Sequence, residues 1–367
     1  MHADVLVVGA GIVGAACAHA LAQAGLRVQV LDAGLGGATG AGMGHLVVMD
    51  DNPAELALCS LSVALWRSLV PQMGEDCAFS PCGTLWIATD DEEMAAAEEK
   101  RARLARVGID CRLLDAHALA KAEPALRPGL AGALEVPDDG IVYAPNAARW
   151  LLAHGGDRIH VERAEVTAID ERGVRLADGG LRHAPQIVLA TGIHATTLCP
   201  ELPIRPKKGH LLITDRYPGT VHHQLVELGY VTSAHHSEGP SVAFNLQPRP
   251  TGQLLLGSSR QFDITDPAVE AAMLEQMLQR ALGYMPGLAE LNAIRCWTGL
   301  RAATPDSLPI LGRHPWREGL WLAVGHEGLG VTTATGSAQL LAALMTGTTP
   351  ALDPKPFAAQ RFPALVR

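Results

Sequence analysis

The chain has 367 residues, of which 48% are hydrophobic and 18% charged, and its formal net charge is −9. This composition is typical of a globular protein with material for two domains, and scattered cations under a net negative charge exclude nucleic acid as the expected partner. Seven cysteines without a CxxC motif predict a reducing, cytoplasmic location, and adjacent histidines at 222–223 and 235–236 without a spaced carboxylate predict no metal site. Because no apolar run reaches roughly 18 residues, no transmembrane segment is expected.

The chain begins with the pattern of a strand–helix–strand unit. Val5–Val8 is a continuous apolar run, as expected of a strand buried on both faces, and an alanine-rich helix pattern follows Gly9, Gly11 and Gly14. A second strand ends at Asp32, where a carboxylate can accept hydrogen bonds from a ribose. Strand, GxGxxG, helix and acid together predict a dinucleotide site without separating FAD from NAD. The residues expected beside the dinucleotide are Gly9, Gly11, Ile12, Val13, Gly14, Asp32 and Ala33.

Glycine-dense segments later in the chain favour FAD. The loop Gly36–Val48 follows the acid directly, and such a loop lets the backbone run along a long, extended cofactor. The run Gln186–Gly192 is a second buried strand that ends in a small turn. No second dinucleotide fingerprint occurs, so a bound flavin is expected to exchange electrons with something other than NAD(P)H. These segments add Thr39, Gly42, Met43, Gly44, His45, Ala190, Thr191 and Gly192 to the expected cofactor contacts.

The middle of the chain alternates hairpins and helices. Residues 160–180 have turn signals typical of a hairpin, and 90–106 is a charged helix interpreted as a solvated face. Strands are expected at 209–214, 241–246 and 253–259, followed by a helix within 266–286.

Arg301 is the most informative single residue of the C-terminal part. It lies among small and apolar residues in "WTGLRAATPDSLPILG", and burial of a guanidinium is costly unless an anion meets it. That anion is either a structural carboxylate such as Asp306 or a bound ligand. Further on, "GLWLAVGHEGLGVTTATG" predicts a strand, a turn and a helix. Either the N-terminal N–H groups of this helix face the flavin, or the helix only packs against a sheet. The turn residues expected at the flavin are His326, Glu327, Gly328, Leu329, Gly330 and Val331.

In the segments "VVGAGIVG", "LATG", "WTGLRAATPDSLPILG", "GHEGLG" and "LDPKPFAAQRF", the chain resembles the D-amino-acid oxidase superfamily of FAD-dependent oxidoreductases, which includes glycine and sarcosine oxidases. "GMGHLVVMDD", "KKGHLLIT" and "LLLGSSRQF" are most similar to the flavin-bearing β subunits of heteromeric dehydrogenases of opines, D-hydroxyproline and related secondary amino acids.

The resemblance implies a mixed α/β fold with two domains. A Rossmann-like FAD domain of the glutathione-reductase type would take 1–80, 142–205 and 300–367, and a substrate domain built on an antiparallel sheet would take 81–141 and 206–299. The resemblance also makes the backbone of Val166 an adenine neighbour. Because the one cysteine near the Arg301 segment is Cys296, which is poorly placed for a flavin linkage, noncovalent FAD is expected.

The implied reaction is oxidation of a C–N bond, with hydride passing to flavin N5 and the imine hydrolysed by water. Arg301 would grip the substrate carboxylate in a bidentate pair. His45 would tune the flavin or guide a proton, or else be a plain hydrogen-bonded histidine under the cofactor. Further residues that could line the pocket, for each of which a structural or exposed position is the favoured interpretation, are His210, Tyr230, His235, His236 and Asn245.

Several functions stay open at this point. The leading interpretation is a dehydrogenase of a D- or secondary amino acid that works as one subunit of a complex, with partner subunits carrying further redox centres. FMN at a subunit interface, as in related heteromeric enzymes, is left open. The alternatives are a free-standing glycine- or sarcosine-type oxidase that makes hydrogen peroxide, a non-catalytic flavin-binding subunit and a nicotinamide dehydrogenase.

Overall fold

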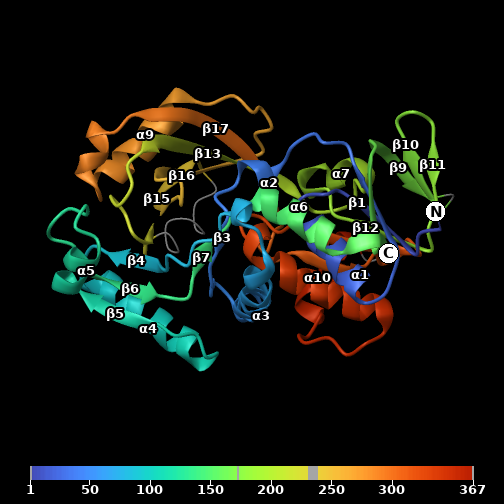
Figure 1. The fold of residues 1–367 in the computed structure, drawn as a ribbon, viewed down its shortest axis with the longest axis horizontal. Helices are drawn as coiled ribbons and strands as arrows, with labels where there is room; N and C mark the ends of the chain where they lie inside the picture. Colours follow the sequence, from blue (N-terminus) through green and yellow to red (C-terminus); the bar gives the residue numbers. More distant parts are fainter. Residues whose placement is uncertain (1, 172, 230–238, 366–367) are drawn as a thin grey trace.

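The strands of the protein form two main sheets, one in each lobe of an elongated molecule (Figure 1). The computed structural model describes residues 2–171, 173–229 and 239–365. The first sheet has six strands in the order β18-β19-β12-β1-β2-β8, and every neighbouring pair is parallel except β18 with β19. Its strands are β1 (Val5–Val8), β2 (Val28–Asp32), β8 (Ile159–Arg163), β12 (Gln186–Leu189), β18 (Ile310–Arg313) and β19 (Leu320–Val324).

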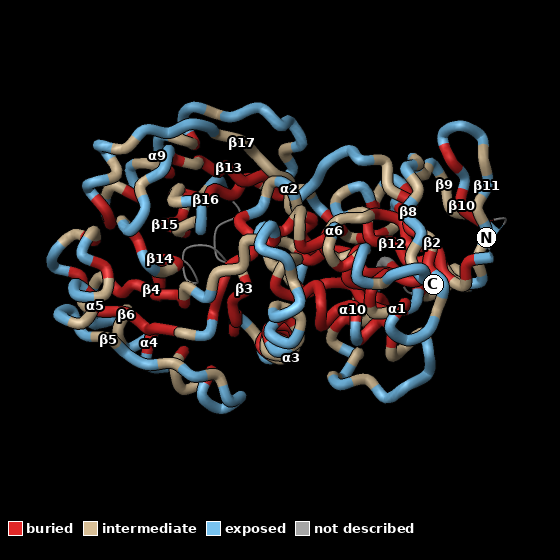
Figure 2. Tube along the Cα trace, in the orientation of Figure 1, coloured by how far each residue is buried: buried red, intermediate tan, exposed pale blue. Residues whose placement is uncertain are grey.

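Apolar residues and small helical side chains build the core of this lobe. All four residues of β1 are buried, and the alanines of the helix that follows allow close helix packing. The same core takes in residues from the C-terminal helix, so the two ends of the chain pack together (Figure 2). The helices of this lobe are α1 (Ile12–Gln23), α3 (Pro53–Leu69), α6 (Ala144–His154) and α10 (Gly330–Thr346).

The second sheet has eight strands in the order β17-β13-β16-β15-β14-β4-β6-β5, all paired antiparallel except β14 with β4. The amphipathic helix α9 buries Met273, Met277 and Ala281 against it. The strands are β4 (Thr84–Ala88), β5 (Arg112–Asp115), β6 (Gly132–Val136), β13 (Arg205–Arg216), β14 (Gln224–Glu227), β15 (Ser241–Pro248), β16 (Gln253–Phe262) and β17 (Ala293–Ala303). The helices are α4 (Asp91–Arg106), α5 (Ala116–Ala122) and α9 (Ala271–Leu282).

Short elements join the two lobes and extend the first. A two-stranded sheet pairs β3 (His45–Leu46) with β7 (Gly140–Ile141), and a three-stranded sheet contains β9 (Val166–Asp170), β10 (Gly173–Leu176) and β11 (Leu181–Arg182). Two further short helices are α2 (Ala38–Ala41) and α7 (Ala195–Leu198). The predicted hairpin over 160–180 is therefore only partly a hairpin, because its first residues belong to β8, which pairs in parallel with β2.

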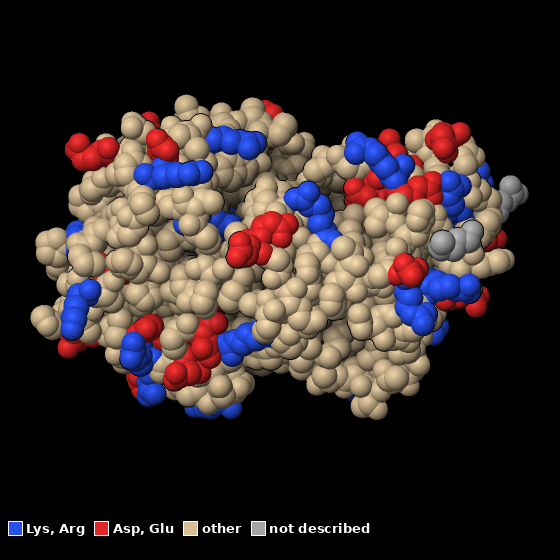
Figure 3. All heavy atoms as spheres, in the orientation of Figure 1, with Lys and Arg blue, Asp and Glu red and all other residues tan. Residues whose placement is uncertain are grey.

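The mixed α/β fold predicted from the sequence is confirmed. The division into domains stays a prediction, and β17 crosses the expected boundary at residue 300. Charged side chains of both signs are scattered over the face shown in Figure 3.

The interpretation of residues 90–106 as a solvated helical face is wrong for one residue of α4. Asp90 caps the helix by accepting from Glu93 N at 2.9 Å, as its position suggests. Lys100, however, is fully buried, with its ammonium paired to Asp50 and 4.2 Å from the centroid of the Trp86 ring. The buried carboxylate of Asp50 and the indole face stabilise the ammonium there.

By length and composition alone, one described helix could cross a membrane, namely the 20 residues Pro53–Gln72 that comprise α3 and a short extension. In the structure α3 packs against α10, and Trp66 Nε1 donates to Val331 O at 3.0 Å. Such packing is typical of a core helix. A buried core helix can be as long and as apolar as a helix that spans a membrane.

Candidate functional site: a long cavity between the two sheets

Five parallel strands of the first sheet end at one edge and line one cavity of about 880 Å³. In sheet order, the residues at or just after these ends are Arg163, Asp32, Gly9, Ala190 and Gly325. Ligands of open α/β sheets bind at this carboxyl edge. The order of the strands in the sheet is thus also the order in which their terminal residues follow one another along the cavity.

Gly9 and Gly14 make the tight turn after β1 possible. Gly9 has a φ of +104°, and a Cβ on it would lie 2.6 Å from Ala190 O. A Cβ on Gly14 would lie 1.9 Å from Gly9 O, so any larger residue there would force α1 away from β1. Gly14, which is expected near the cofactor, does not itself line the cavity: it lets helix and strand meet.

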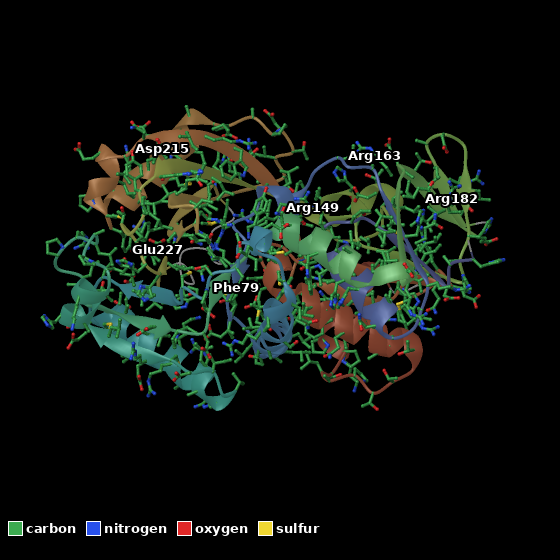
Figure 4. All side chains as sticks on the ribbon, viewed as in Figure 1. Phe79, Arg149, Arg163, Arg182, Asp215 and Glu227 are labelled. Atoms are coloured by element: carbon green, nitrogen blue, oxygen red, sulfur yellow. The ribbon has the colours of Figure 1, made fainter. Side chains whose placement is uncertain are left out.

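Asp32 and Thr39 hold the loops around this end of the cavity. Asp32 accepts from Ala10 N at 2.6 Å and from Gly34 N at 2.7 Å, and Thr39 Oγ1 accepts from Ile12 N at 2.9 Å. Arg163 and, on α6, Arg149 also line the cavity; both are labelled in Figure 4. These arginines add positive charge at the end of the cavity next to β2 and β8.

Two helices point their N-termini at the cavity. Neither α1 nor α10 has a side-chain cap or an acidic residue in its first turn, although each is at least 12 residues long. The residues around both starts, Gly11–Val13 and Gly328–Val331, line the cavity. Uncapped N–H groups and a helix dipole favour negative charge, so this donor set fits the diphosphate and the reducible ring of a flavin dinucleotide.

The opposite wall of the cavity is one face of the eight-stranded sheet. Because side chains alternate along strands, residues on this face come from every second position of β13, β16 and β17 near the site. The described lining residues of this wall are Trp86, Gly209, Leu211, Val226, Asn245, Ser258, Arg260, Gly299 and Arg301, and Leu300 and Ala302, which alternate with the last two on β17, also border the cavity.

Arg301 reaches across β13 toward β16. Its Nη1 donates to Ser259 O at 3.1 Å, and the guanidinium passes directly over Gly209, where a Cβ would lie 2.6 Å from Nη1. Asp306, the alternative partner considered from the sequence, instead pairs with Arg361, whose Nε lies 2.6 Å from Asp306 Oδ2. The hypothesis of an Arg301–Asp306 ion pair is therefore wrong.

His45 is half-buried in a polar network at the junction of the two walls. Gln224 Oε1, the closest neighbour of Nδ1, can only accept, because Gln224 Nε2 donates to Gly140 O at 3.0 Å. A proton on Nδ1 satisfies Gln224 Oε1 and leaves Nε2 to accept from Asn245 Nδ2 at 3.1 Å. Gln247 Nε2, which lies 2.8 Å from the same Nδ1, then donates to Gln224 Oε1 at 3.2 Å. Burial, together with the charge of Arg249 and against the hydrogen bond to Gln224, lowers the pKa of His45 to about 4, so the ring is neutral near pH 7.

This network also orients Asn245. Since its amide nitrogen faces His45, its Oδ1 faces away, and this buried oxygen has no hydrogen-bond partner among the described residues. A buried acceptor without a donor is costly, and Asn245 lines the cavity. The site thus offers an acceptor that a ligand N–H can satisfy.

The turn before α10 places one histidine and one carboxylate at the same end. His326 Nε2 lies 3.1 Å from Ser337 Oγ, and burial lowers the pKa of His326 to about 3. Glu327, with a φ of +49°, forms an ion pair with the buried Lys207 of β13. His45 and His326 are thus both neutral near pH 7.

Of the residues predicted to contact the cofactor, every one except Gly14 lines this cavity. Among the further candidates, Asn245 lines it, whereas His210 lies on the other face of the sheet, bonded to Ser259 Oγ at 2.8 Å and to Glu270 N at 3.0 Å. Cys296 also points away from the cavity, into the core beneath α9. The candidates Tyr230, His235 and His236 lie outside the described residues.

A separate group of Cys199, Glu201 and His314 has potential metal-ligand atoms within 4.8 Å of one another. Arg317 Nη2 already lies 2.9 Å from Glu201 Oε1, and burial raises the pKa of Cys199 to about 11, which keeps the thiol protonated. A guanidinium and a neutral thiol make a poor cation site.

The family model described as DAO, FAD dependent oxidoreductase, matches residues 4–344. The chain belongs to this family. It is thus an FAD-dependent oxidoreductase.

Relatives of this DAO-family chain match it over nearly its whole length. It is 30% identical to glycine oxidase of Pseudomonas putida, over 98% of this chain and 99% of the relative, and 29% identical to hydrogen cyanide synthase subunit HcnC of Pseudomonas aeruginosa, over 98% and 96%. The crystal structure of glycine oxidase from Geobacillus kaustophilus matches with a TM-score of 0.87 at 26% identity, over 98% of this chain and 99% of that one.

The sequence reasoning missed several residues of this DAO-family site. Arg260 was not singled out, although a charged residue within the apolar strand pattern of "LLLGSSRQF" is the same kind of signal that drew attention to Arg301. Gln224, Gln247 and Lys207 carry no local signal, because each acts through a partner on another strand or turn.

Proposed function

We propose that this enzyme oxidises the C–N bond of a D- or secondary amino acid, such as a proline- or opine-like compound, and that it works as a subunit of a dehydrogenase complex. The observation that carries the proposal is Arg301, whose guanidinium lies over Gly209 in the cavity wall and close to Gly328 at the start of α10. An arginine beside a flavin site can fix a carboxylate at two points and so orient the α-carbon.

FAD, when bound, accepts the hydride that leaves the α-carbon. Arg301 holds the substrate carboxylate, and Asn245 Oδ1 accepts the amine N–H, so the two groups set the direction of the C–H bond. Because His45 and His326 are neutral and hydrogen-bonded, the amine enters as the free base and its remaining proton goes to solvent. Water then adds to the C=N bond: an open-chain imine releases an oxo acid together with ammonia or an amine, and a cyclic imine opens to a single amino oxo acid. The two electrons pass to an external acceptor.

The test is anaerobic mixing of the yellow holoenzyme with a panel of D-amino acids, proline and hydroxyproline isomers, sarcosine, glycine and opines, while flavin absorbance is followed near 450 nm. At least one compound should bleach the flavin. Arg301→Ala should lower the second-order rate of bleaching by roughly 100-fold to 1000-fold with FAD content unchanged, and Arg301→Lys should recover part of it. Absence of bleaching by every amine would favour a non-catalytic flavin-binding subunit.

The relatives support two electron acceptors. A subunit of hydrogen cyanide synthase supports transfer to partner subunits, and glycine oxidase supports direct reaction with oxygen. Aerobic turnover with peroxide detection separates them, because rapid peroxide formation by the isolated chain would refute the dehydrogenase and leave the free-standing oxidase. FMN at a subunit interface and a cytoplasmic location stay predictions.

A further inference from the structure

A row of buried polar side chains lies next to the cavity on the eight-stranded sheet. Thr84, Gln224 and Gln247 belong to the neighbouring strands β4, β14 and β15, and all three are fully buried. Because side chains alternate along strands, these residues share a face with the residues two positions further along or back. Those residues line the cavity and are Trp86, Val226 and Asn245. The polar row therefore adjoins the cavity without lining it.

Two groups with a fixed hydrogen-bonding role orient both amides of the polar row. The carbonyl of Gly140 can only accept, so the amide nitrogen of Gln224 faces it at 3.0 Å. The guanidinium of Arg249 can only donate, so the amide oxygen of Gln247 faces its Nη1 at 3.3 Å. The other contacts follow: Gln247 Nε2 donates to Gln224 Oε1 at 3.2 Å, and Gln224 Nε2 donates to Thr84 Oγ1 at 3.2 Å.

A carboxylate ends the polar row on the far side of Thr84. The Thr84 hydroxyl, whose oxygen accepts from Gln224, donates to Asp139. Asp139 is 1% exposed, and its Oδ2 has no hydrogen-bond partner among the described residues. Every hydrogen bond of the row thus points from the cation Arg249 toward the anion Asp139. Opposite charges at the two ends strengthen bonds that run in this direction.

His45 contacts the middle of the polar row. Its Nδ1 donates to Gln224 Oε1, and its Nε2 accepts from Asn245 Nδ2 at 3.1 Å. If the Gln224 amide were turned over, its N–H would face Nδ1, so that Nε2 would carry the proton and donate to the amide oxygen of Asn245. The direction of the row therefore determines which atom of Asn245 is left for the cavity.

We propose that Asp139 and Arg249 are positioning residues for the oxidation, which hold the Nδ1–H form of His45 from the two ends of the polar row and thereby turn Asn245 Oδ1 toward the substrate amine. Neither Asp139 nor Arg249 lines the cavity, so both act through the row. This inference rests on the proposed function, in which Asn245 Oδ1 accepts the amine N–H.

The charge at the Asp139 end of the row depends on pH. The groups that face this carboxyl are Thr84, the backbone N–H of Val48, Arg67 and Cys59 of α3, Lys100 of α4, and Cys82. Burial raises the pKa of Asp139 to about 7, against the two hydrogen bonds and the two cations. Burial also raises the pKa of both thiols, which stay neutral in this range. Between pH 6 and pH 8 the carboxyl therefore gains its negative charge.

Proton NMR of the holoenzyme tests the polar row without any substrate. The Nδ1–H of His45 should give a downfield signal that is missing in His45→Asn. In wild type this signal should move upfield as the pH falls from 8 to 6, with a midpoint of about 7, because protonation of Asp139 weakens the row. Asp139→Asn and Thr84→Val should both abolish this titration, whereas Thr84→Ser should keep it. Asp138→Asn is the control and should keep it too, because it removes an adjacent, exposed carboxylate that pairs with Arg67.

The rate of flavin bleaching tests the consequence for the amine. With the panel compound that bleaches wild type fastest, Asp139→Asn should lower the second-order rate by about 5-fold to 20-fold at pH 8 and by less than about 2-fold at pH 6, with FAD content unchanged. Arg249→Met should lower the rate at both pH values, and Arg249→Lys should recover part of the loss, because a cation remains. Propionate, which has a carboxylate but no amine, should perturb the flavin spectrum at the same concentration in wild type and Asp139→Asn.

The outcomes separate this inference from the proposed function. A His45 signal that is the same in wild type and Asp139→Asn at both pH values would overturn the role of the row, whichever amine the enzyme oxidises. An equal loss of bleaching rate at pH 6 and pH 8 in Asp139→Asn would overturn it as well, because a merely structural carboxyl gives that result. A signal that titrates with Asp139, without bleaching by any amine, would support the row while the proposed reaction fails.

Discussion

The two walls of the cavity present different parts of the chain to a ligand. Along the edge of the six-stranded sheet, the contacts are backbone groups at strand ends and helix starts, and glycines are needed where a Cβ would collide with the main chain. Across the cavity, the eight-stranded sheet presents side chains such as Arg260, Arg301 and Asn245. The first wall suits a constant cofactor, whereas single substitutions can retune the second.

The largest effect is expected at Gly14. Its Cβ would lie 1.9 Å from Gly9 O, and neither backbone can yield without moving α1 from β1. Gly14→Ala should destabilise the protein by more than about 4 kcal/mol and yield protein without bound FAD. Flavin absorbance after gel filtration and chemical denaturation measure both effects. Gly287→Ala is the control, since a Cβ there has nothing within 4 Å; a yellow, stable Gly14→Ala protein would contradict the packing argument.

Next in size is the ion pair between Lys207 and Glu327. Glu327→Gln leaves a buried ammonium without its partner and should lower the free energy of unfolding by about 3 kcal/mol. The double variant Lys207→Met with Glu327→Gln should regain most of this loss, because the charge is gone as well. Denaturant unfolding of wild type, Glu327→Gln, Lys207→Met and the double variant forms a double-mutant cycle, and simple additivity of the two single losses would argue against the pair.

His45 predicts a dependence of stability on pH. Its pKa is about 4 in the folded chain against 6.5 in the unfolded one, so the unfolded state binds more protons between these values. The stability contributed by the neutral ring is complete above about pH 6.5 and is lost as the pH falls toward 4, by up to about 3 kcal/mol. Unfolding of wild type and His45→Asn at pH 7 and pH 4 measures it, and parallel losses in both proteins would remove His45 as the cause.

Gly209 should give the smallest effect and the clearest contrast with Gly14. A Cβ there meets the mobile end of Arg301 rather than backbone, so the fold can adapt by moving the guanidinium. Gly209→Ala should retain FAD and raise the apparent KM of the amine by roughly 10-fold to 100-fold, equivalent to about 1.4 to 2.7 kcal/mol. Titration of flavin bleaching measures the change. Loss of FAD instead would contradict the view that the six-stranded sheet holds the cofactor and the eight-stranded sheet contacts the substrate.

The sequence predicted the residues at the edge of the six-stranded sheet far better than those on the face of the eight-stranded sheet. Gly9, Gly14 and Asp32 fall within one strand–helix–strand unit, where spacing alone encodes the geometry. The pair Lys207–Glu327 spans 120 positions and the contact of His45 with Asn245 spans 200, so only the sheet register brings these residues together. Arg301 was the exception, because a guanidinium among apolar residues is visible locally even when its surroundings are not. The roles of the individual residues toward FAD and substrate stay predictions.

The order of strands along the cavity has a consequence for how the enzyme is made. The central strands come from residues 5–8 and 186–189, but β19 and the start of α10, which complete the cavity, come from 320–331. A chain emerging from the ribosome therefore exposes its first βαβ unit long before the partners of that unit exist. The cofactor can be captured in full only near the end of synthesis, so capture of FAD should coincide with final closure of the lobe rather than seed it.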